Sequence, residues 1–305
     1  MRIAYAGTPD FAVPALQGLI GHNADIVGVW TQPDRPAGRG RKLTPSAVKK
    51  AAETAGLPVH QPLSLKNPED QETLLNSGAD IFIVAAYGLL LPPQIVHGFR
   101  LGCVNLHGSL LPRWRGAAPI QRAIQAGDTY TGVGLMRIEE GLDTGAVIGE
   151  MRTPIDPMDT AQDVHDRLAA MGWPLLKTHW QDLLDHVPGQ PQSTQGIEYA
   201  AKLSKLEARL DFNEPAEVIQ RKMHAFNPAP GAWIEGEFGR IKLHRCEVHP
   251  NPGLQPGEIG PAPDLLIGTG TGALRILEWQ FAGAKAQPLP RIVQTQRLVP
   301  GRFLQ

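Results

Sequence analysis

The first half of the chain alternates short apolar runs with amphipathic segments, and turn-forming residues separate them. A bounded apolar run predicts a buried strand, and apolar residues three or four apart predict a helix. Their alternation is typical of βαβ units, which build a mostly parallel sheet with helices on both faces. The predicted strands are RIAYAG (2–7), DIVGVWTQ (25–32), VHQP (59–62), ADIFIVAA (79–86) and LGCVNLH (101–107), and the predicted helices cover about 10–22, 45–55 and 68–77.

The pattern changes in the second half. Strands are predicted at 130–138 and 146–153, and then a helical segment from about 160 to 185 with an irregularity at Gly172 and Pro174. HVPGQPQSTQG (186–196) is rich in Gly, Pro, Gln and Ser, which favours a linker. After a charged helix at 216–226, short alternating runs indicate a small antiparallel barrel. We therefore expect an α/β domain over 1–188, a linker over 189–207 and a β domain over 208–305.

The composition excludes two classes of protein. Of the 305 residues, 42% are apolar and 19% are charged, which is too apolar for a disordered chain. The longest apolar stretch, ADIFIVAAYGLLLPP, contains Asp80 and ends in two prolines, so it does not predict a membrane span. The N-terminus lacks a signal-peptide pattern, and Cys103 and Cys246 fit neither a disulfide framework nor a zinc site. We expect a cytoplasmic protein that binds neither membrane nor metal.

Basic residues gather in two segments, although the net charge is only −1. Residues 35–50 (RPAGRGRKLTPSAVKK) hold six Lys or Arg and no acid, and residues 279–305 hold four and no acid. Such segments indicate a local anionic partner. Charge alone leaves the alternative open that they are a solvated loop and a solvated tail.

Two glycine-containing motifs argue against nucleotide binding of the common kinds. The first strand ends in AGTPDF, with one glycine where a dinucleotide-binding fold has Gly-x-Gly-x-x-Gly. IGTGTGA (267–273) lies between two predicted strands with no helix after it, which favours a hairpin turn. The chain also has no Walker A sequence. The sheet therefore needs a different ligand.

The segment LGCVNLHGSLLPRWRGAAPIQ contains the first candidate for catalysis. Asn105 and His107 are two apart on a predicted strand, so they share a face at its carboxyl end, where open α/β sheets bind ligands. An amide and an imidazole there can stabilise an oxyanion on a transferred acyl carbon, and the imidazole can also transfer a proton. The alternative is a pair of residues that hydrogen-bond at the end of a strand.

Asp143 in GLDTGA (141–146) is the second candidate. A carboxylate on a loop can orient His107 or move a proton. The alternative is ordinary turn chemistry, since Asp between glycines is common in turns. The sequence does not place Asp143 near His107.

Taken together, six motifs resemble those of the folate-dependent formyltransferases: AGTPDFA, TQPDRPAGRGRKLTPSAVK, VAAYGLLLP, NLHGSLLPRWRGAAPIQ, TGVGLM and EEGLDTG. The resemblance runs in order from Arg2 to the C-terminal VPGRFL. It implies a Rossmann-like catalytic domain (1–188), a linker and an OB-like, tRNA-binding barrel (208–305). The GRGRK loop resembles that of family members whose partner is methionyl-initiator tRNA, so the implied product is formylmethionyl-tRNA for translation initiation.

The resemblance also implies roles for individual residues. The donor would be 10-formyltetrahydrofolate, without a metal, and the protein would be a monomer. The implied catalytic residues are Asn105, His107 and Asp143; the folate-binding residues are Tyr87, Gly88, Leu89, Ser109, Leu110, Leu111 and Pro112; the tRNA-binding residues are Arg35, Arg39, Arg41 and Lys42.

Three alternatives remain beside this interpretation. The acceptor could be an amino sugar nucleotide or glycinamide ribonucleotide, the acceptor could be water, or the chain could bind RNA without catalysing a reaction. Two positions depart from the family pattern outside the catalytic motifs. Leu206 stands where an acid is usual and Ala229 where an aromatic residue is usual, which weakens any claim about contacts near them.

Overall fold

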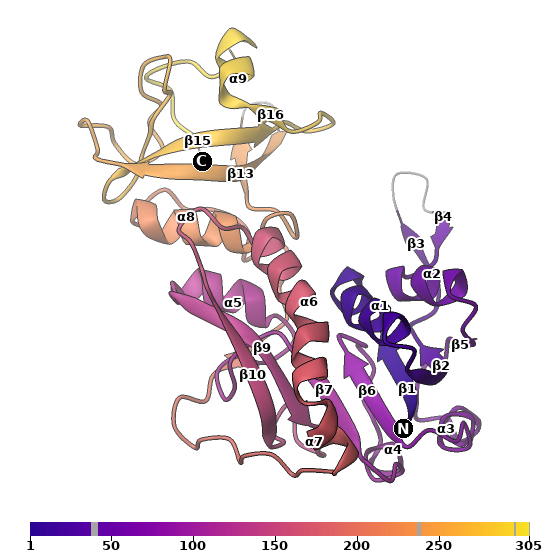
Figure 1. The fold of residues 1–305 in the computed structure, drawn as a ribbon. Helices are drawn as coiled ribbons and strands as arrows, with labels where there is room; N and C mark the ends of the chain where they lie inside the picture. The colour runs from indigo at the N-terminus through magenta and orange to yellow at the C-terminus, as the bar shows by residue number, and fades with distance from the viewer. Residues whose placement is uncertain (38–41, 237–238, 296, 305) are drawn as a thin grey trace. The chain divides into compact units, whose positions relative to one another are not determined.

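The computed structural model describes residues 1–37, 42–236, 239–295 and 297–304, which form two compact units (Figure 1). The first unit comprises residues 1–116, 131–153 and 165–199, and the second comprises 117–130, 154–164 and 200–305. Each unit thus draws on separate stretches of the chain. The division at residues 188 and 207 stays a prediction.

A seven-stranded sheet forms the centre of the first unit, in the order β10-β9-β7-β6-β1-β2-β5. All five strands predicted in the first half of the chain are present and run parallel to one another, and β9 pairs with β7 antiparallel. The predicted α/β class with a mostly parallel sheet is therefore confirmed. The strands are β1 (Arg2–Gly7), β2 (Asp25–Trp30), β5 (Val59–His60), β6 (Ile81–Ala85), β7 (Cys103–His107), β9 (Tyr130–Arg137) and β10 (Val147–Pro154).

Helices cover both faces of this sheet. Side chains of β1 and β6 at alternate positions, Ala4 and Phe82 among them, pack with Leu74 and Ile95. On the opposite face, Leu106 of β7 lies against Gly172 of α6. The helices are η1 (Asp10–Ala12), α1 (Val13–Gly21), α2 (Ala47–Thr54), α3 (Pro68–Leu75), α4 (Pro93–Val96), α6 (Ala161–Thr178) and α7 (Trp180–Leu184).

Three local features differ from the sequence-based expectation. Helix α6 continues through Gly172 and Pro174 and ends only at Thr178. The lost backbone hydrogen bond at Pro174 is tolerated because Leu175 and Leu176 are fully buried beside it. The basic segment contains a short hairpin of β3 (Arg35–Ala37) and β4 (Lys42–Thr44), and β8 (Arg115–Gly116) pairs with β11 (Tyr199–Ala200).

The second unit contains the predicted antiparallel strands. Their order is β12-β13-β15-β14, and β16 also pairs with β15. Among the described residues the pairing does not close into a ring, so the sheet is antiparallel but no barrel closure is observed. IGTGTGA is the predicted hairpin turn, with Gly268 opposite Ala273. The elements are α5 (Pro119–Ala126), α8 (Ala216–Ala225), β12 (Trp233–Gly236), β13 (Gly239–His249), β14 (Ile267–Gly268), β15 (Ala273–Gln280), β16 (Gln287–Pro288) and α9 (Leu289–Thr295).

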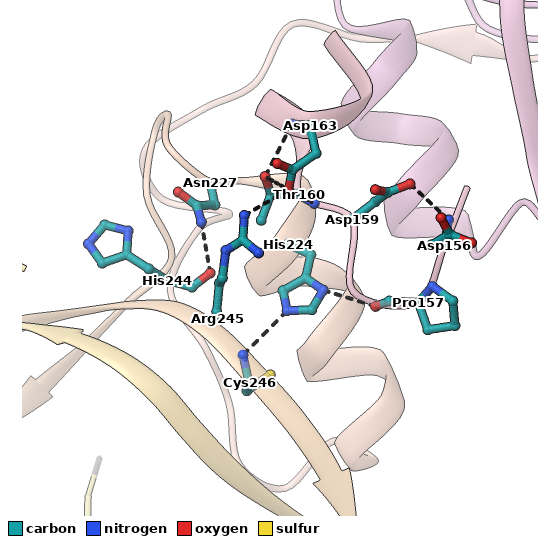
Figure 2. A network of polar contacts seen from close by, with 10 residues as sticks. All are labelled: Asp156, Pro157, Asp159, Thr160, Asp163, His224, Asn227, His244, Arg245 and Cys246. Carbon is teal, nitrogen blue, oxygen red and sulfur yellow. Dashed lines mark hydrogen bonds and ion pairs between the residues drawn. The ribbon is translucent and has the colours of Figure 1, made fainter. Parts of the chain in front are cut away.

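A buried histidine joins three segments of this unit (Figure 2). His224 of α8 is 1% exposed, and its Nδ1 lies 3.2 Å from the carbonyl oxygen of Pro157. The amide of Cys246 on β13 donates to Nε2 at 3.3 Å. Since a carbonyl only accepts, Nδ1 carries the proton and the imidazole is neutral. Burial lowers the pKa of His224 from its ordinary value of 6.5, and the cation of nearby Arg245, itself paired with Asp163, acts in the same direction.

We expect His224 to make the stability of the fold depend on pH. Below about pH 6.5 the unfolded chain binds a proton at this position that the folded chain excludes. The free energy of unfolding should therefore fall as the pH falls, and level off above about pH 7. Chemical denaturation at a series of pH values should show this fall in the free energy of unfolding in the wild type and a smaller fall in His224→Gln. The exposed His97, changed to Gln, is the matched control; equal pH slopes for wild type and His224→Gln would contradict the assignment.

Candidate active site

Strand β7 brings Asn105 and His107 to the edge of the sheet where the parallel strands end. The two side chains share one face because they are two positions apart. His107 is 6% exposed and Asn105 is partly buried. No described residue hydrogen-bonds to the side-chain amide of Asn105, so this amide is open to a ligand.

The backbone of Trp114 holds the imidazole of His107. Its carbonyl oxygen lies 2.9 Å from Nε2. Because this oxygen only accepts, the proton of the neutral imidazole resides on Nε2 and Nδ1 keeps its lone pair. Nδ1 lies 3.7 Å from Oδ2 of Asp143. His107 therefore presents a basic nitrogen beside a carboxylate.

The carboxylate of Asp143 is itself held by backbone. Oδ2 accepts a hydrogen bond from the amide of Gly116 at 2.8 Å. Asp143 has φ of +52°, a left-handed conformation that Asp adopts more readily than most side chains. The structure thus brings together His107 and Asp143, which the sequence alone left apart.

The segments predicted to bind folate follow β6 and β7, which are neighbouring strands. Tyr87 is buried in the core, and its carbonyl accepts from Thr8 Oγ1 at 2.9 Å and from Gln32 Nε2 at 3.0 Å. Ser109 is fully buried, and its hydroxyl donates to the carbonyl of Arg113 at 2.7 Å, which closes the loop after β7. The other predicted positions are Gly88, which is exposed, and Leu89, Leu110, Leu111 and Pro112, which are partly buried.

The basic hairpin β3–β4 is anchored at its base. Nζ of Lys49 lies 2.9 Å from Oδ2 of Asp34 and donates to Gln61. Arg35 donates to Oε1 of Gln32 at 2.6 Å. Lys42 is exposed. Two of the predicted tRNA-binding residues, Arg39 and Arg41, lie outside the described residues.

Two side chains at the site were missed by the sequence analysis. Gln192 contacts the loop of Asp143, although it lies in the segment predicted as a linker. Gln32 joins Arg35 to the carbonyl of Tyr87. A glutamine in a polar segment carries no signal of its own, because its partners are backbone groups far away in sequence.

The described residues contain no group of three or more His, Cys, Asp or Glu side chains that could hold a metal ion. Cys103 and Cys246 are both unpaired and buried. Burial raises the pKa of the Cys103 thiol to about 12, which keeps it protonated. Within the described part of the chain, no helix is long and apolar enough to cross a membrane.

Comparison with known proteins finds similarity along nearly the whole chain. A family model described as formyl transferase matches residues 1–178, and one described as formyl transferase, C-terminal domain, matches 202–297. A methionyl-tRNA formyltransferase of Chromohalobacter salexigens is 49% identical, and the match covers 93% of this chain and 90% of that relative. One of Marinobacter nauticus is 46% identical, and the match covers both chains completely.

A solved structure shows the same fold at lower identity. An N-formyltransferase from Helicobacter canadensis, in complex with folinic acid and dTDP-3-aminofucose, has a TM-score of 0.66. It is 18% identical, and the match covers 90% of this chain and 98% of that one.

The close approach of the loop after β7 to strand β9 depends on Gly132. A Cβ there would lie 2.5 Å from Cδ2 of Leu110 and closer still to the carbonyl oxygen of Met151. We therefore expect Gly132→Ala to lower the free energy of unfolding by about 1–3 kcal/mol through overpacking. Urea denaturation measures this change. Gly21→Ala, where a Cβ meets nothing within 4 Å, is the control, and equal effects of the two variants would contradict the packing argument.

Proposed function

This chain belongs to the formyl transferase family, and we propose that it transfers the formyl group of 10-formyltetrahydrofolate to the free amino group of methionyl-initiator tRNA. The observation that carries the proposal is the match to relatives whose names state this activity. Each match covers at least 90% of this chain and at least 90% of the relative. The product is formylmethionyl-tRNA, the substrate of translation initiation, which supports a cytoplasmic location. The family resemblance supports a monomer.

In this proposal, 10-formyltetrahydrofolate binds at the end of β7. Its formyl carbon is bonded to N10 of the folate. Transfer forms a bond from this carbon to the nitrogen of the methionyl amine and breaks its bond to N10. The open amide of Asn105 donates to the formyl oxygen, where negative charge develops. This role needs a hydrogen-bond donor that is not already bonded to another protein group. The side-chain NH₂ of Asn105 has no such bond among the described residues.

His107 and Asp143 handle the proton in this proposal. Nε2 is occupied by the carbonyl of Trp114, so Nδ1 is the nitrogen that accepts the proton of the attacking amine. The resulting imidazolium faces Asp143 Oδ2 and donates from Nδ1 to the oxygen of the tetrahedral centre. The proton then passes to the departing N10, which balances the reaction.

The loops after β6 and β7 form the folate site in this proposal. Tyr87, Gly88 and Leu89 lie on the first loop, and Ser109, Leu110, Leu111 and Pro112 lie on the second. Their support is that both loops follow neighbouring strands at the carboxyl edge that carries His107. Since the hydroxyl of Ser109 is bonded to Arg113, we assign Ser109 to shaping the loop.

The basic segment with Arg35, Arg39, Arg41 and Lys42 contacts the acceptor end of the tRNA in this proposal, and the domain over 208–305 contacts its backbone. The support is the acid-free basic composition of residues 35–50 and of residues 279–305 at the end of that domain. Cationic side chains gain affinity from RNA phosphates irrespective of base sequence.

We expect His107→Ala and Asp143→Ala each to lower turnover by about 10²–10³, because each removes a group that acts on the transition state. The measurement is transfer of labelled formyl from 10-formyltetrahydrofolate to methionyl-initiator tRNA, with the exposed His97→Ala as control. Parallel reactions offer elongator methionyl-tRNA, glycinamide ribonucleotide, an amino sugar nucleotide or water. Label on one of those instead of initiator tRNA would refute the acceptor, and near wild-type turnover of His107→Ala would refute the site.

Changing Arg35, Arg39, Arg41 and Lys42 together to Ala should weaken tRNA binding at every salt concentration and flatten its salt dependence. Each lost phosphate contact reduces the slope of log K against log salt by about 0.7–0.9. Filter binding from low to high salt measures the slope. Lys66→Ala removes an exposed cation outside the hairpin and should leave the slope unchanged; a wild-type slope in the quadruple variant would argue against docking at the hairpin.

A further inference from the structure

We propose that Gln192 is a positioning residue that fixes the loop of Asp143 relative to His107. The proposal rests on the function proposed above, and it concerns a residue outside the motifs that carry that function. Gln192 lies in a segment that its composition presents as a linker, about fifty positions from its main partner in sequence.

The side-chain amide of Gln192 has all its hydrogen-bonding capacity used. Nε2 donates to the carbonyl of Asp143 at 2.8 Å and to the carbonyl of Gly145 at 2.8 Å. Oε1 accepts from Arg115, from Nε at 3.0 Å and from Nη2 at 2.7 Å. A primary amide has two donor hydrogens and two lone pairs, so these four bonds determine which way the group points.

Arg115 sets the direction of that amide. Its guanidinium is a donor without acceptor capacity, and the residue is 7% exposed. Because Arg115 can only donate, the atom of Gln192 that faces it must be the amide oxygen, Oε1. The NH₂ group of Gln192 then points toward the loop of Asp143. The two hydrogen bonds from the guanidinium thus fix the orientation of the Gln192 amide.

The contacts close a ring around the loop of Asp143. Gly116, the residue after Arg115, donates to the carboxylate of Asp143, and Gln192 holds the backbone carbonyl of the same residue. Both the main chain and the side chain of Asp143 are thus fixed. Asp143 adopts φ of +52°, an unfavourable region for a non-glycine residue. The hydrogen bonds from Gly116 and Gln192 stabilise this conformation.

The sharpest test is Gln192→Glu. A carboxylate keeps the size of the side chain and its acceptor for Arg115, but its second oxygen cannot donate to the carbonyls of Asp143 and Gly145 and places an acceptor against both of them. We expect kcat of formyl transfer to fall about 10–100-fold with KM for both substrates within twofold, because displacement of a catalytic group by about 1 Å costs up to about 10² in rate. A fall in kcat at unchanged KM separates displacement of the catalytic groups from loss of substrate binding.

Two controls separate positioning from a general loss of structure. Gln190→Ala removes an exposed side chain from the same segment and should leave kcat and KM unchanged. Urea denaturation of Gln192→Glu checks that the variant is folded under assay conditions. Wild-type kcat in Gln192→Glu would overturn the proposal.

A readout without turnover keeps this proposal distinct from the proposed function. Histidine ring nuclei are followed by NMR at one fixed pH, with His107→Gln identifying the signals of His107. In Gln192→Glu the ring signals of His107 should shift relative to the wild type, whether or not the protein formylates tRNA, and in Gln190→Ala they should stay in place. Unchanged signals of His107 in Gln192→Glu would refute the positioning role. Shifted signals in the variant, together with a wild type that transfers no formyl group, would refute only the function.

Discussion

The site depends on the backbone of three consecutive residues, Trp114 to Gly116. The carbonyl of Trp114 fixes the proton of His107 on Nε2, and the amide of Gly116 holds the carboxylate of Asp143. Between them, Arg115 orients Gln192 against the main chain of Asp143. Trp114 and Gly116 both have positive φ, which turns successive peptide groups toward different partners. One short stretch of chain therefore sets both the tautomer of the histidine and the position of the carboxylate.

The sheet makes this arrangement rigid. Neighbouring strands β6 and β7 are almost fully buried, so the carboxyl end of β7 has little freedom to move. The face that carries Asn105 and His107 also carries Cys103, which packs in the core with Ile95 and Phe82. Burial of apolar side chains at one end of the strand thus fixes polar side chains at the other. Asn105 and His107 therefore do not have to stabilise the strand themselves.

Local patterns in the sequence predict what depends on local order. The strand LGCVNLH places Asn105 and His107 on one face by alternation alone, and the apolar runs predict the parallel sheet. The meeting of His107 with Asp143 depends on contacts between distant segments, and only the family resemblance pointed to it. The contacts of Gln192 could not be predicted, because the segment around it has no apolar pattern. Its hydrogen bonds go to backbone carbonyls that are distant in sequence. The antiparallel strands of the second unit are present as predicted. Ring closure, which alternation does not encode, is not observed among the described residues.

A second set of polar contacts links the basic hairpin to the loop after β6. Arg35 donates to Gln32, and Gln32 donates to the carbonyl of Tyr87. The same carbonyl accepts a hydrogen bond from the hydroxyl of Thr8, which follows β1. That hydroxyl oxygen also accepts from the backbone amide of Gln32. Without the contact from Arg35, the carbonyl of Tyr87 would keep both of its donors, Thr8 and Gln32. The polar contacts that hold the loop after β6 therefore do not depend on the hairpin.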